Sequence, residues 1–176
     1  YWDTSISGQV NMITAERQPG SSFKPFTYLT AFQKGYTPAT MLLDIPTSFP
    51  DGINPLYVPQ NVDGKYRGPI PVRDALAMSL NIPAVKTLQY AKIPDVIDTA
   101  HRMGITTLNR INTYGLSLTL GGGEVKLLDM AFAYSVLANS GRMIGNPVPT
   151  AERVSGQREL EPVAILKVED ANGRVL

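Results

Sequence analysis

Residues 17–26 read RQPGSSFKPF, and this stretch has the features of a helix start. Pro19-Gly20 interrupts the chain before it, and serine is favoured at the beginning of a helix. Pro25 fits a helix only in the first turn, where backbone N–H groups still lack intrahelical acceptors. These constraints predict a helix that starts at about residues 21–23 and continues, with apolar residues at helical spacing, to about residue 34.

Ser21 and Lys24 lie three positions apart in this helix and form a candidate nucleophile and base. Side chains at that spacing share a helix face, with Cβ atoms roughly 5–6 Å apart, so the lysine nitrogen is expected to reach the serine oxygen. Lysine accepts a proton only when it is neutral, and its reference pKa of about 10.4 must therefore fall toward neutrality. We expect Lys24 to lie in a largely desolvated cleft. Ser21 is expected at the positive end of the helix dipole, where a developing oxyanion is favoured.

Other residues that can carry chemistry receive structural interpretations. The single histidine, His101, falls in a predicted helix without a nearby serine motif, so a Ser-His-Asp triad is not predicted. The run GGG at 121–123 lacks the spacing of a phosphate-binding loop and is interpreted as a tight turn before a helix. Nothing orients Glu124 and Asp129 toward the serine. No metal-ligand cluster is recognised, and neither a metal nor a cofactor is expected.

The composition is that of an ordinary globular domain. The chain has 176 residues, of which 43% are hydrophobic and 18% charged, with a net charge of +1. Its scattered basic residues lack an aromatic stacking platform, which argues against a nucleic-acid partner. The absence of cysteine excludes disulfides and thiolate metal sites. No apolar run approaches the roughly 18–20 residues of a membrane-spanning helix.

Helical and turn signals alternate along the rest of the chain. Residues 36–70 contain six prolines and two Asp-Gly pairs, which predict a long irregular excursion with at most short strands. Apolar periodicity and turn residues further predict helices over about 72–78, 82–90, 94–103 and 126–139, and a β-hairpin over about 163–176.

A second candidate motif, Ser79-Leu80-Asn81, occupies the joint between two predicted helices. A hydroxyl and an amide two positions apart on such a joint can face one cleft. An alternative is that Ser79 closes the first helix and Asn81 caps the next, with Pro83 in its first turn. The spacing leaves both interpretations open.

Together the motifs resemble those of a known family. Ser21-x-x-Lys24 followed by Ser79-x-Asn81 is similar to the first two signature motifs of the penicillin-binding serine transpeptidases and their β-lactamase relatives. The flanking stretches look like those of class A bifunctional penicillin-binding proteins, the peptidoglycan glycosyltransferase/transpeptidases: RQPGSSFKPFTY at 17–28, NIPAVK at 81–86, LGGGEV at 120–125 and LDMAFAY at 128–134. The resemblance implies an α+β fold of the β-lactamase/transpeptidase type. This chain is expected to be predominantly helical with a small antiparallel β component.

The resemblance also implies a mechanism and a location. Ser21 would attack the penultimate D-alanine of a peptidoglycan stem peptide and form an acyl-enzyme, which an amine of a second stem peptide resolves into a cross-link. Lys24 would take the serine proton, Ser79 would relay a proton to the leaving amine, and Asn81 would bind the substrate amide and hold Lys24. β-Lactams would acylate Ser21 as mimics of D-Ala-D-Ala. Such proteins act at the outer face of the cytoplasmic membrane, in the cell envelope.

The sequence departs from the family pattern at one motif. No lysine is followed by Thr-Gly or Ser-Gly, although the family carries a Lys-Thr-Gly strand beside the serine. Residues 1–176 are therefore expected to be one incomplete transpeptidase domain without its C-terminal strands and without a glycosyltransferase domain. Such a piece is expected to expose an apolar surface or to bind a complementary fragment. Membrane attachment would come only through missing parts of the parent protein.

Two alternative functions use the same residues. In a D,D-carboxypeptidase or a β-lactamase, water rather than an amine attacks the acyl-enzyme. A penicillin-binding sensor would be acylated and stop without turnover. The pairing of Lys24 with Asn81 argues against a scaffold without chemistry, but it does not exclude a sensor.

Overall fold

The computed structural model describes residues 3–51, 54–163 and 167–175. Helices hold more of these residues than strands do. The α-helices are α1 (Lys24–Gln33), α2 (Val72–Ala77), α3 (Asn81–Ala91), α4 (Ile93–Arg102) and α5 (Leu127–Ala138). Short 3₁₀ turns are η1 (Thr4–Ile6), η2 (Gly20–Phe23), η3 (Ile111–Thr113), η4 (Leu116–Leu120) and η5 (Thr150–Glu152).

The strands of the described residues form four antiparallel pairs of two strands each. These pairs are β1 (Glu16–Arg17) with β6 (Val125–Lys126), β2 (Met41–Asp44) with β5 (Gly68–Pro71), β3 (Phe49–Asp51) with β4 (Asn54–Tyr57), and β7 (Asn146–Pro147) with β8 (Leu160–Glu161). The expected combination of a helical majority with a small antiparallel β component is confirmed.

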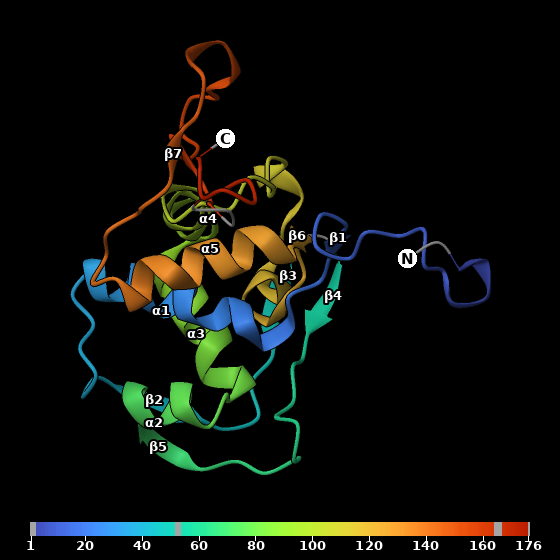
Figure 1. Ribbon diagram of the computed structural model, residues 1–176. Coiled ribbons are helices and arrows are strands. Elements are labelled where there is room, and N and C mark those ends of the chain that lie inside the picture. Colours follow the sequence, from blue (N-terminus) through green and yellow to red (C-terminus); the bar gives the residue numbers. More distant parts are fainter. Residues whose placement is uncertain (1–2, 52–53, 164–166, 176) are drawn as a thin grey trace.

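Helix α1 lies between the other helices of the core, with α3 on one side and α5 on the other (Figure 1). Its side chains divide between two clusters. Phe26 of α1, together with Phe23 at the end of η2, is fully buried among residues of α3, α4, α5 and η4, whereas Tyr28 of α1 packs with β2, β5 and α2. Because both clusters hold α1, the first residue of this helix is fixed against α3 and the loop before it.

Most predicted boundaries agree with the structure. The 3₁₀ turn η2 leads directly into α1, and α2 and α3 flank residues 78–80. The described residues of the 36–70 excursion contain only strands of three or four residues. In the predicted hairpin, Asp170 N donates to Arg174 O at 2.9 Å and Glu169 forms an isolated bridge with Val175. Much of its first strand, residues 164–166, lies outside the described residues.

A buried ion pair joins α5 to the segment before β8. Arg158 Nη1 donates to Asp129 Oδ1 at 2.7 Å, and both side chains are at least nine-tenths buried. The second carboxylate oxygen of Asp129 accepts from the backbone N–H of Thr106 at 2.9 Å and from its hydroxyl at 2.6 Å. The structural interpretation of Asp129 is therefore confirmed. Within the described part of the chain, no helix has the length and apolar character needed to cross a membrane.

Candidate active site

Lys24, the first residue of α1, points inward and is surrounded by oxygen atoms of the α2–α3 joint. Only 1% of its surface is exposed. Its Nζ donates to the backbone oxygen of Ser79 at 2.5 Å, to Ser79 Oγ at 3.0 Å and to Asn81 Oδ1 at 2.7 Å. The structure thus brings together three of the four predicted residues, Lys24, Ser79 and Asn81, across a separation of more than fifty positions in the sequence.

Burial changes the protonation of this lysine. Loss of solvent lowers the pKa of Lys24 from 10.5 to about 8. An ammonium group has three N–H donors, and here it has three acceptors. A neutral amine keeps two donors and gains a lone pair, to which a serine hydroxyl can donate. The predicted burial of Lys24 is confirmed, and the site suits a base that works near neutral pH.

Ser79 has a strained backbone that directs its carbonyl toward Lys24. Its φ is 54°, in the left-handed region that residues with a Cβ adopt at a cost of about 1–2 kcal/mol. The turn that ends α2 is nevertheless closed, because Ser79 N donates to Leu76 O at 2.9 Å and Leu80 N donates to Ala75 O at 3.0 Å. Strain of this kind is typical of functional sites.

Asn81 does not cap α3 with its side chain, so the capping interpretation is wrong for this residue. It is the first residue of the helix, and the residue at the cap position, Leu80, makes no side-chain cap bond. Asn81 Oδ1 instead accepts from Lys24, and its Nδ2 donates to Gln60 O at 2.7 Å. The backbone N–H of Asn81 donates to Asn61 Oδ1 at 2.8 Å. Gln60 and Asn61 gave no sequence signal, because they lie in the irregular excursion about twenty positions earlier.

Ser21 lies in η2, one turn before Lys24, and its residue is exposed. Among the described residues, its hydroxyl forms no hydrogen bond with Lys24 or with any other group. The expected contact between the lysine nitrogen and the serine oxygen is therefore absent, because the three N–H groups of Lys24 bind Ser79 and Asn81. The neighbouring hydroxyl, that of Ser22, does form a hydrogen bond: its Oγ donates to Pro19 O at 2.6 Å. The Ser22 carbonyl accepts from the Tyr134 hydroxyl of α5 at 2.9 Å. The segment that carries Ser21 is thus anchored on α5, while the Ser21 hydroxyl itself is accessible.

The glycine run packs against the backbone just before Ser21. Gly121 ends η4 with a φ of 95°, and a Cβ at this position would lie 2.3 Å from Gly20 N. Only glycine therefore permits η4 to approach η2 this closely. The predicted tight turn is present, and it additionally forms part of the support for the candidate nucleophile.

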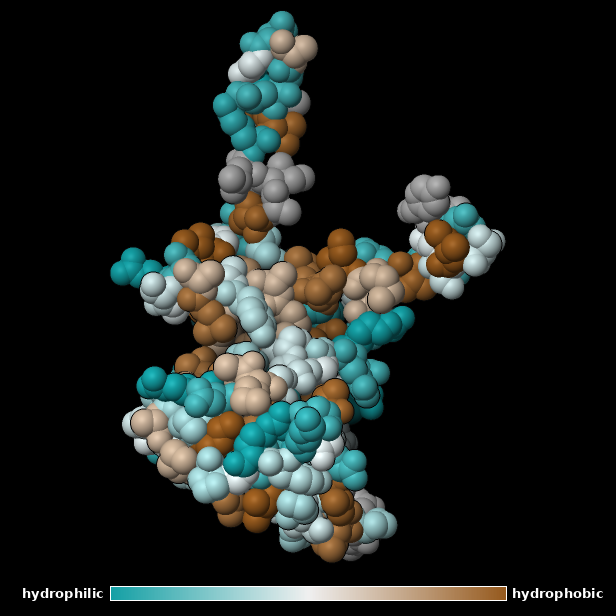
Figure 2. Space-filling view, turned by 90° about the horizontal axis from the view of Figure 1, so that it is seen from below, coloured by the Kyte–Doolittle hydropathy of each residue, from teal (hydrophilic) through white to brown (hydrophobic). Residues whose placement is uncertain are grey.

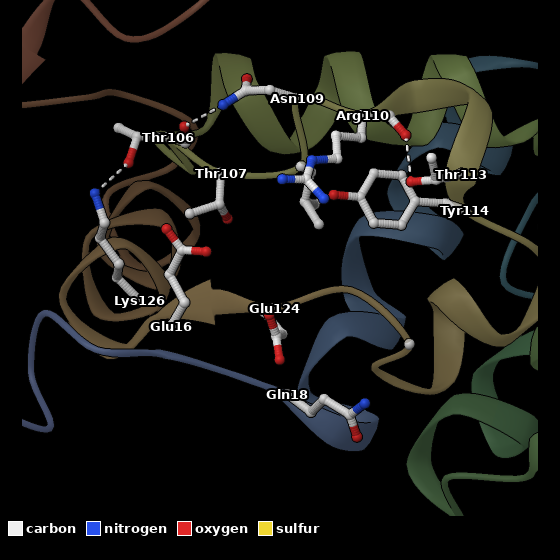
Figure 3. Close-up of a pocket in the computed structure, with 12 residues that line it drawn as sticks. Glu16, Gln18, Thr106, Thr107, Asn109, Arg110, Thr113, Tyr114, Glu124 and Lys126 are labelled. Atoms are coloured by element: carbon white, nitrogen blue, oxygen red, sulfur yellow. Dashed lines mark hydrogen bonds between the residues drawn. The ribbon is translucent and has the colours of Figure 1, made fainter.

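One cavity of the described structure is lined by none of the four predicted site residues. It has a volume of about 690 Å³, and Figure 3 shows the polar side chains around it, among them Glu16, Glu124, Arg110 and Lys126. Acidic and basic groups are mixed around the space rather than converging on one point. His101 contacts the backbone of the same helix-end segment, with its Nε2 2.6 Å from Thr107 O, and it is not one of the residues that line the cavity. We therefore locate the candidate active site at Lys24 and the 79–81 joint.

Solved structures of penicillin-binding proteins have the same fold. Penicillin-binding protein 1A of Haemophilus influenzae is 31% identical, with a TM-score of 0.76, over 96% of this chain and 23% of that one. The PonA1 protein of Mycobacterium tuberculosis, solved in complex with penicillin V, is 27% identical with a TM-score of 0.72, over 95% of this chain and 42% of that one. The fold is therefore that of a penicillin-binding protein transpeptidase domain.

Sequence comparison gives the family. The penicillin binding protein transpeptidase domain matches residues 6–152, and the chain belongs to this family. A curated relative, penicillin-binding protein 1A of Neisseria cinerea, is 40% identical over 136 residues, which make up 76% of this chain. The aligned region is 17% of the length of that relative.

Proposed function

We propose that this chain carries the acyl-transfer residues of a serine D,D-transpeptidase that cross-links peptidoglycan stem peptides. One observation carries the proposal: an almost fully buried lysine with a lowered pKa lies one helical turn after an exposed serine and is bound to both polar residues of the 79–81 joint. All three acceptors of the lysine come from this joint, which thereby holds the amine in place one helical turn after the serine.

In the proposed reaction, Ser21 Oγ attacks the carbonyl carbon of the penultimate D-alanine while neutral Lys24 accepts the hydroxyl proton. The C–N bond to the terminal D-alanine then breaks, and the leaving amine receives a proton through the Ser79 hydroxyl, which lies 3.0 Å from Lys24 Nζ. An ester on Ser21 remains. The amine of a second stem peptide attacks this ester and forms the new amide bond. The C–O bond to Ser21 breaks, and the proton that the amine gives up passes to Ser21 Oγ.

Asn81 has two tasks in this proposal. Its Oδ1 holds Lys24, and its side-chain amide contributes to binding the substrate amide. A β-lactam carries a strained amide that resembles D-Ala-D-Ala and would acylate the same serine. The PonA1 complex with penicillin V supports this part of the proposal, since that protein has the same fold.

The place of action is also a proposal. Family membership supports the outer face of the cytoplasmic membrane, where stem peptides are cross-linked. We further propose that residues 1–176 form part of one transpeptidase domain whose remaining strands complete the substrate site. Experiments on acylation and turnover should therefore use the whole gene product.

The proposal is tested with fluorescent penicillin and mass spectrometry of the labelled peptide. We expect one adduct per protein, on Ser21, and its loss in Ser21→Ala. Ser22→Ala is the matched control, because it removes the adjacent hydroxyl and should retain labelling. An adduct on another residue, or none, contradicts the proposal.

Turnover distinguishes the related activities. A stem-peptide donor incubated with an amine acceptor should give the cross-linked amide. Release of only the hydrolysed donor would indicate a D,D-carboxypeptidase, and acylation by penicillin without any turnover would indicate a sensor.

A further inference from the structure

A buried carboxylate and a buried amide are linked by hydrogen bonds to the backbone of Asn81. Asp44, at the end of β2, has no exposed surface, and Asn61 is only 4% exposed. Asn61 Nδ2 donates to the two carboxylate oxygens of Asp44 at 2.9 and 3.0 Å and to Lys65 O at 2.8 Å. The backbone N–H of Arg67 donates to the same carboxylate at 3.0 Å.

The carboxylate determines which way the Asn61 amide points. A carboxylate can only accept hydrogen bonds, so Asn61 must present its NH₂ group to Asp44. Its oxygen is therefore turned toward Asn81, where it accepts the first backbone N–H of α3 at 2.8 Å. This bond satisfies a helix-start N–H that has no intrahelical acceptor.

The side chain of Asn81 links this group of hydrogen bonds to Lys24. Asn81 Nδ2 donates to Gln60 O at 2.7 Å, which leaves Asn81 Oδ1 facing Lys24 Nζ at 2.7 Å. Three segments far apart in the sequence, β2, the 60–67 loop and the start of α3, thus converge behind one acceptor of the lysine. We propose that Asp44 and Asn61 are positioning residues that act through Asn81 to hold Lys24 in its working place.

The catalytic consequence of this inference rests on the proposed function, but the positioning itself does not. Replacement of Asp44 by asparagine gives the Asn61 amide a partner that both donates and accepts. If Asn61 then turns around, two N–H groups face each other at Asn81. If it does not turn, two NH₂ groups compete at position 44. In the first case the Asn81 N–H loses its acceptor. In the second case the Asn61 amide is held less firmly, and the start of α3 is less well fixed.

The test compares Asp44→Asn, Asn61→Ala and the double variant Asp44→Asn/Asn61→Asp in the whole gene product. The double variant exchanges the amide and the carboxylate. Its acid at position 61 can accept from both residue 44 and the Asn81 backbone, but it loses the bond that Asn61 Nδ2 makes to Lys65 O. Val62→Ala is the matched control, because it changes an exposed side chain in the same loop. Rates of penicillin acylation are measured on the folded fraction, determined by circular dichroism.

We expect the maximal acylation rate to fall about 10- to 100-fold in each single variant, because small displacements of a catalytic group have effects of this size. The penicillin concentration that gives the half-maximal rate should change little. The double variant should recover part of the loss, because it restores the contacts with residue 44 and the Asn81 backbone but not the bond to Lys65 O. Unchanged rates in the single variants, or a double variant as slow as Asp44→Asn, would overturn the inference.

A second readout is independent of catalysis. NMR of lysine-labelled protein measures the pKa of Lys24, which should rise in both single variants toward its ordinary value as water enters, and remain unchanged in Val62→Ala. If the wild-type protein is not acylated, the proposed function fails, while this readout still tests the positioning. A Lys24 pKa that is equal in wild type and both single variants overturns the inference, even where those variants are less stable.

Discussion

At the scale of single residues, the amine of Lys24 is removed from water on folding and is hydrogen-bonded instead to three protein oxygen atoms. Burial disfavours the ammonium form, whereas the acceptors from Ser79 and Asn81 compensate part of that loss. The outcome is a lysine whose pKa lies near physiological pH rather than far above it. Such a group can exist in both protonation states during one reaction cycle. A base that accepts a proton and later returns it needs this property.

The first prediction concerns pH. A base acts in its neutral form, and burial lowers the pKa of Lys24 to about 8. The acylation rate should therefore rise about tenfold per pH unit below this value and become constant above it. Stopped-flow measurements with fluorescent penicillin from pH 6 to pH 9.5 would determine the profile. A flat profile would show that Lys24 is not the base.

The second prediction concerns removal of the base. Lys24→Met preserves length and apolar packing but leaves no amine, and the acylation rate should fall by about 10²–10⁴-fold. Lys92→Met, which changes an exposed lysine, serves as the control and should acylate at the wild-type rate. Equal loss in both variants would point to a general effect on folding rather than to proton transfer.

The sequence could propose four candidate residues because each pair lies within a short motif, Ser21 with Lys24 and Ser79 with Asn81, and three of them, Lys24, Ser79 and Asn81, lie in contact. Their contact partners could not be predicted. Asn61 meets Asp44 across seventeen positions and Asn81 across twenty, and only the fold of the irregular 36–70 excursion brings them together. Local sequence patterns do not indicate such contacts, because Asp44 and Asn61 are residue types that also occur in ordinary turns.

At the scale of elements, the approach of η4 to η2 supports the candidate nucleophile. Gly121 has a φ of 95° and lies against the backbone of Gly20, while Tyr134 of α5 binds the carbonyl of Ser22. The sequence indicated a turn at the glycine run, because glycine is favoured where φ is positive. It did not indicate what the turn touches, since close backbone contact between distant segments leaves no periodic signal.

The third prediction tests this contact. Gly121→Ala places a Cβ within 3 Å of Gly20 atoms and should displace the Ser21 segment, lowering both stability and acylation rate. Gly141→Ala is the matched control. It introduces a side chain at a φ of 83° with no neighbour within 4 Å, and so adds backbone strain alone. We expect a loss of about 1–2 kcal/mol in thermal unfolding for the control and a greater loss for Gly121→Ala, with slower acylation only in the latter. Equal acylation rates would refute the supporting role.

The fourth prediction concerns the ion pair between α5 and the segment before β8. Arg158→Met leaves the carboxylate of Asp129 buried without its cation, and removal of one partner of a buried pair costs about 3–5 kcal/mol. Arg153→Met is the control, because its pair with Glu159 is longer, at 3.7 Å, and exposed. Chemical denaturation should show a large loss only for Arg158→Met. A loss below about 1 kcal/mol would mean that the Thr106 bonds suffice for Asp129.

At the scale of the whole molecule, apolar side chains reach the surface in several places. Figure 2 shows such residues between hydrophilic ones on the face it displays. Helix α5 adds an apolar stripe on its outer side, where Leu127 is 58% and Leu137 is 42% exposed. The sequence predicted this helix from its apolar face, but its residues are apolar on more than one face, and periodicity alone could not say which would be buried.

The last prediction follows from that stripe. Exposed apolar patches bind hydrophobic dyes and favour association, so the 176-residue chain should increase the fluorescence of a naphthalenesulfonate dye while it is folded. Leu127→Lys combined with Leu137→Lys should lower that fluorescence by about half without loss of helical circular dichroism, because both side chains already contact water. Val62→Lys, a substitution at an exposed position of a loop, should leave it unchanged. If the chain binds no dye, or if the control lowers the signal as much as the double variant, the stripe on α5 is not an accessible apolar surface.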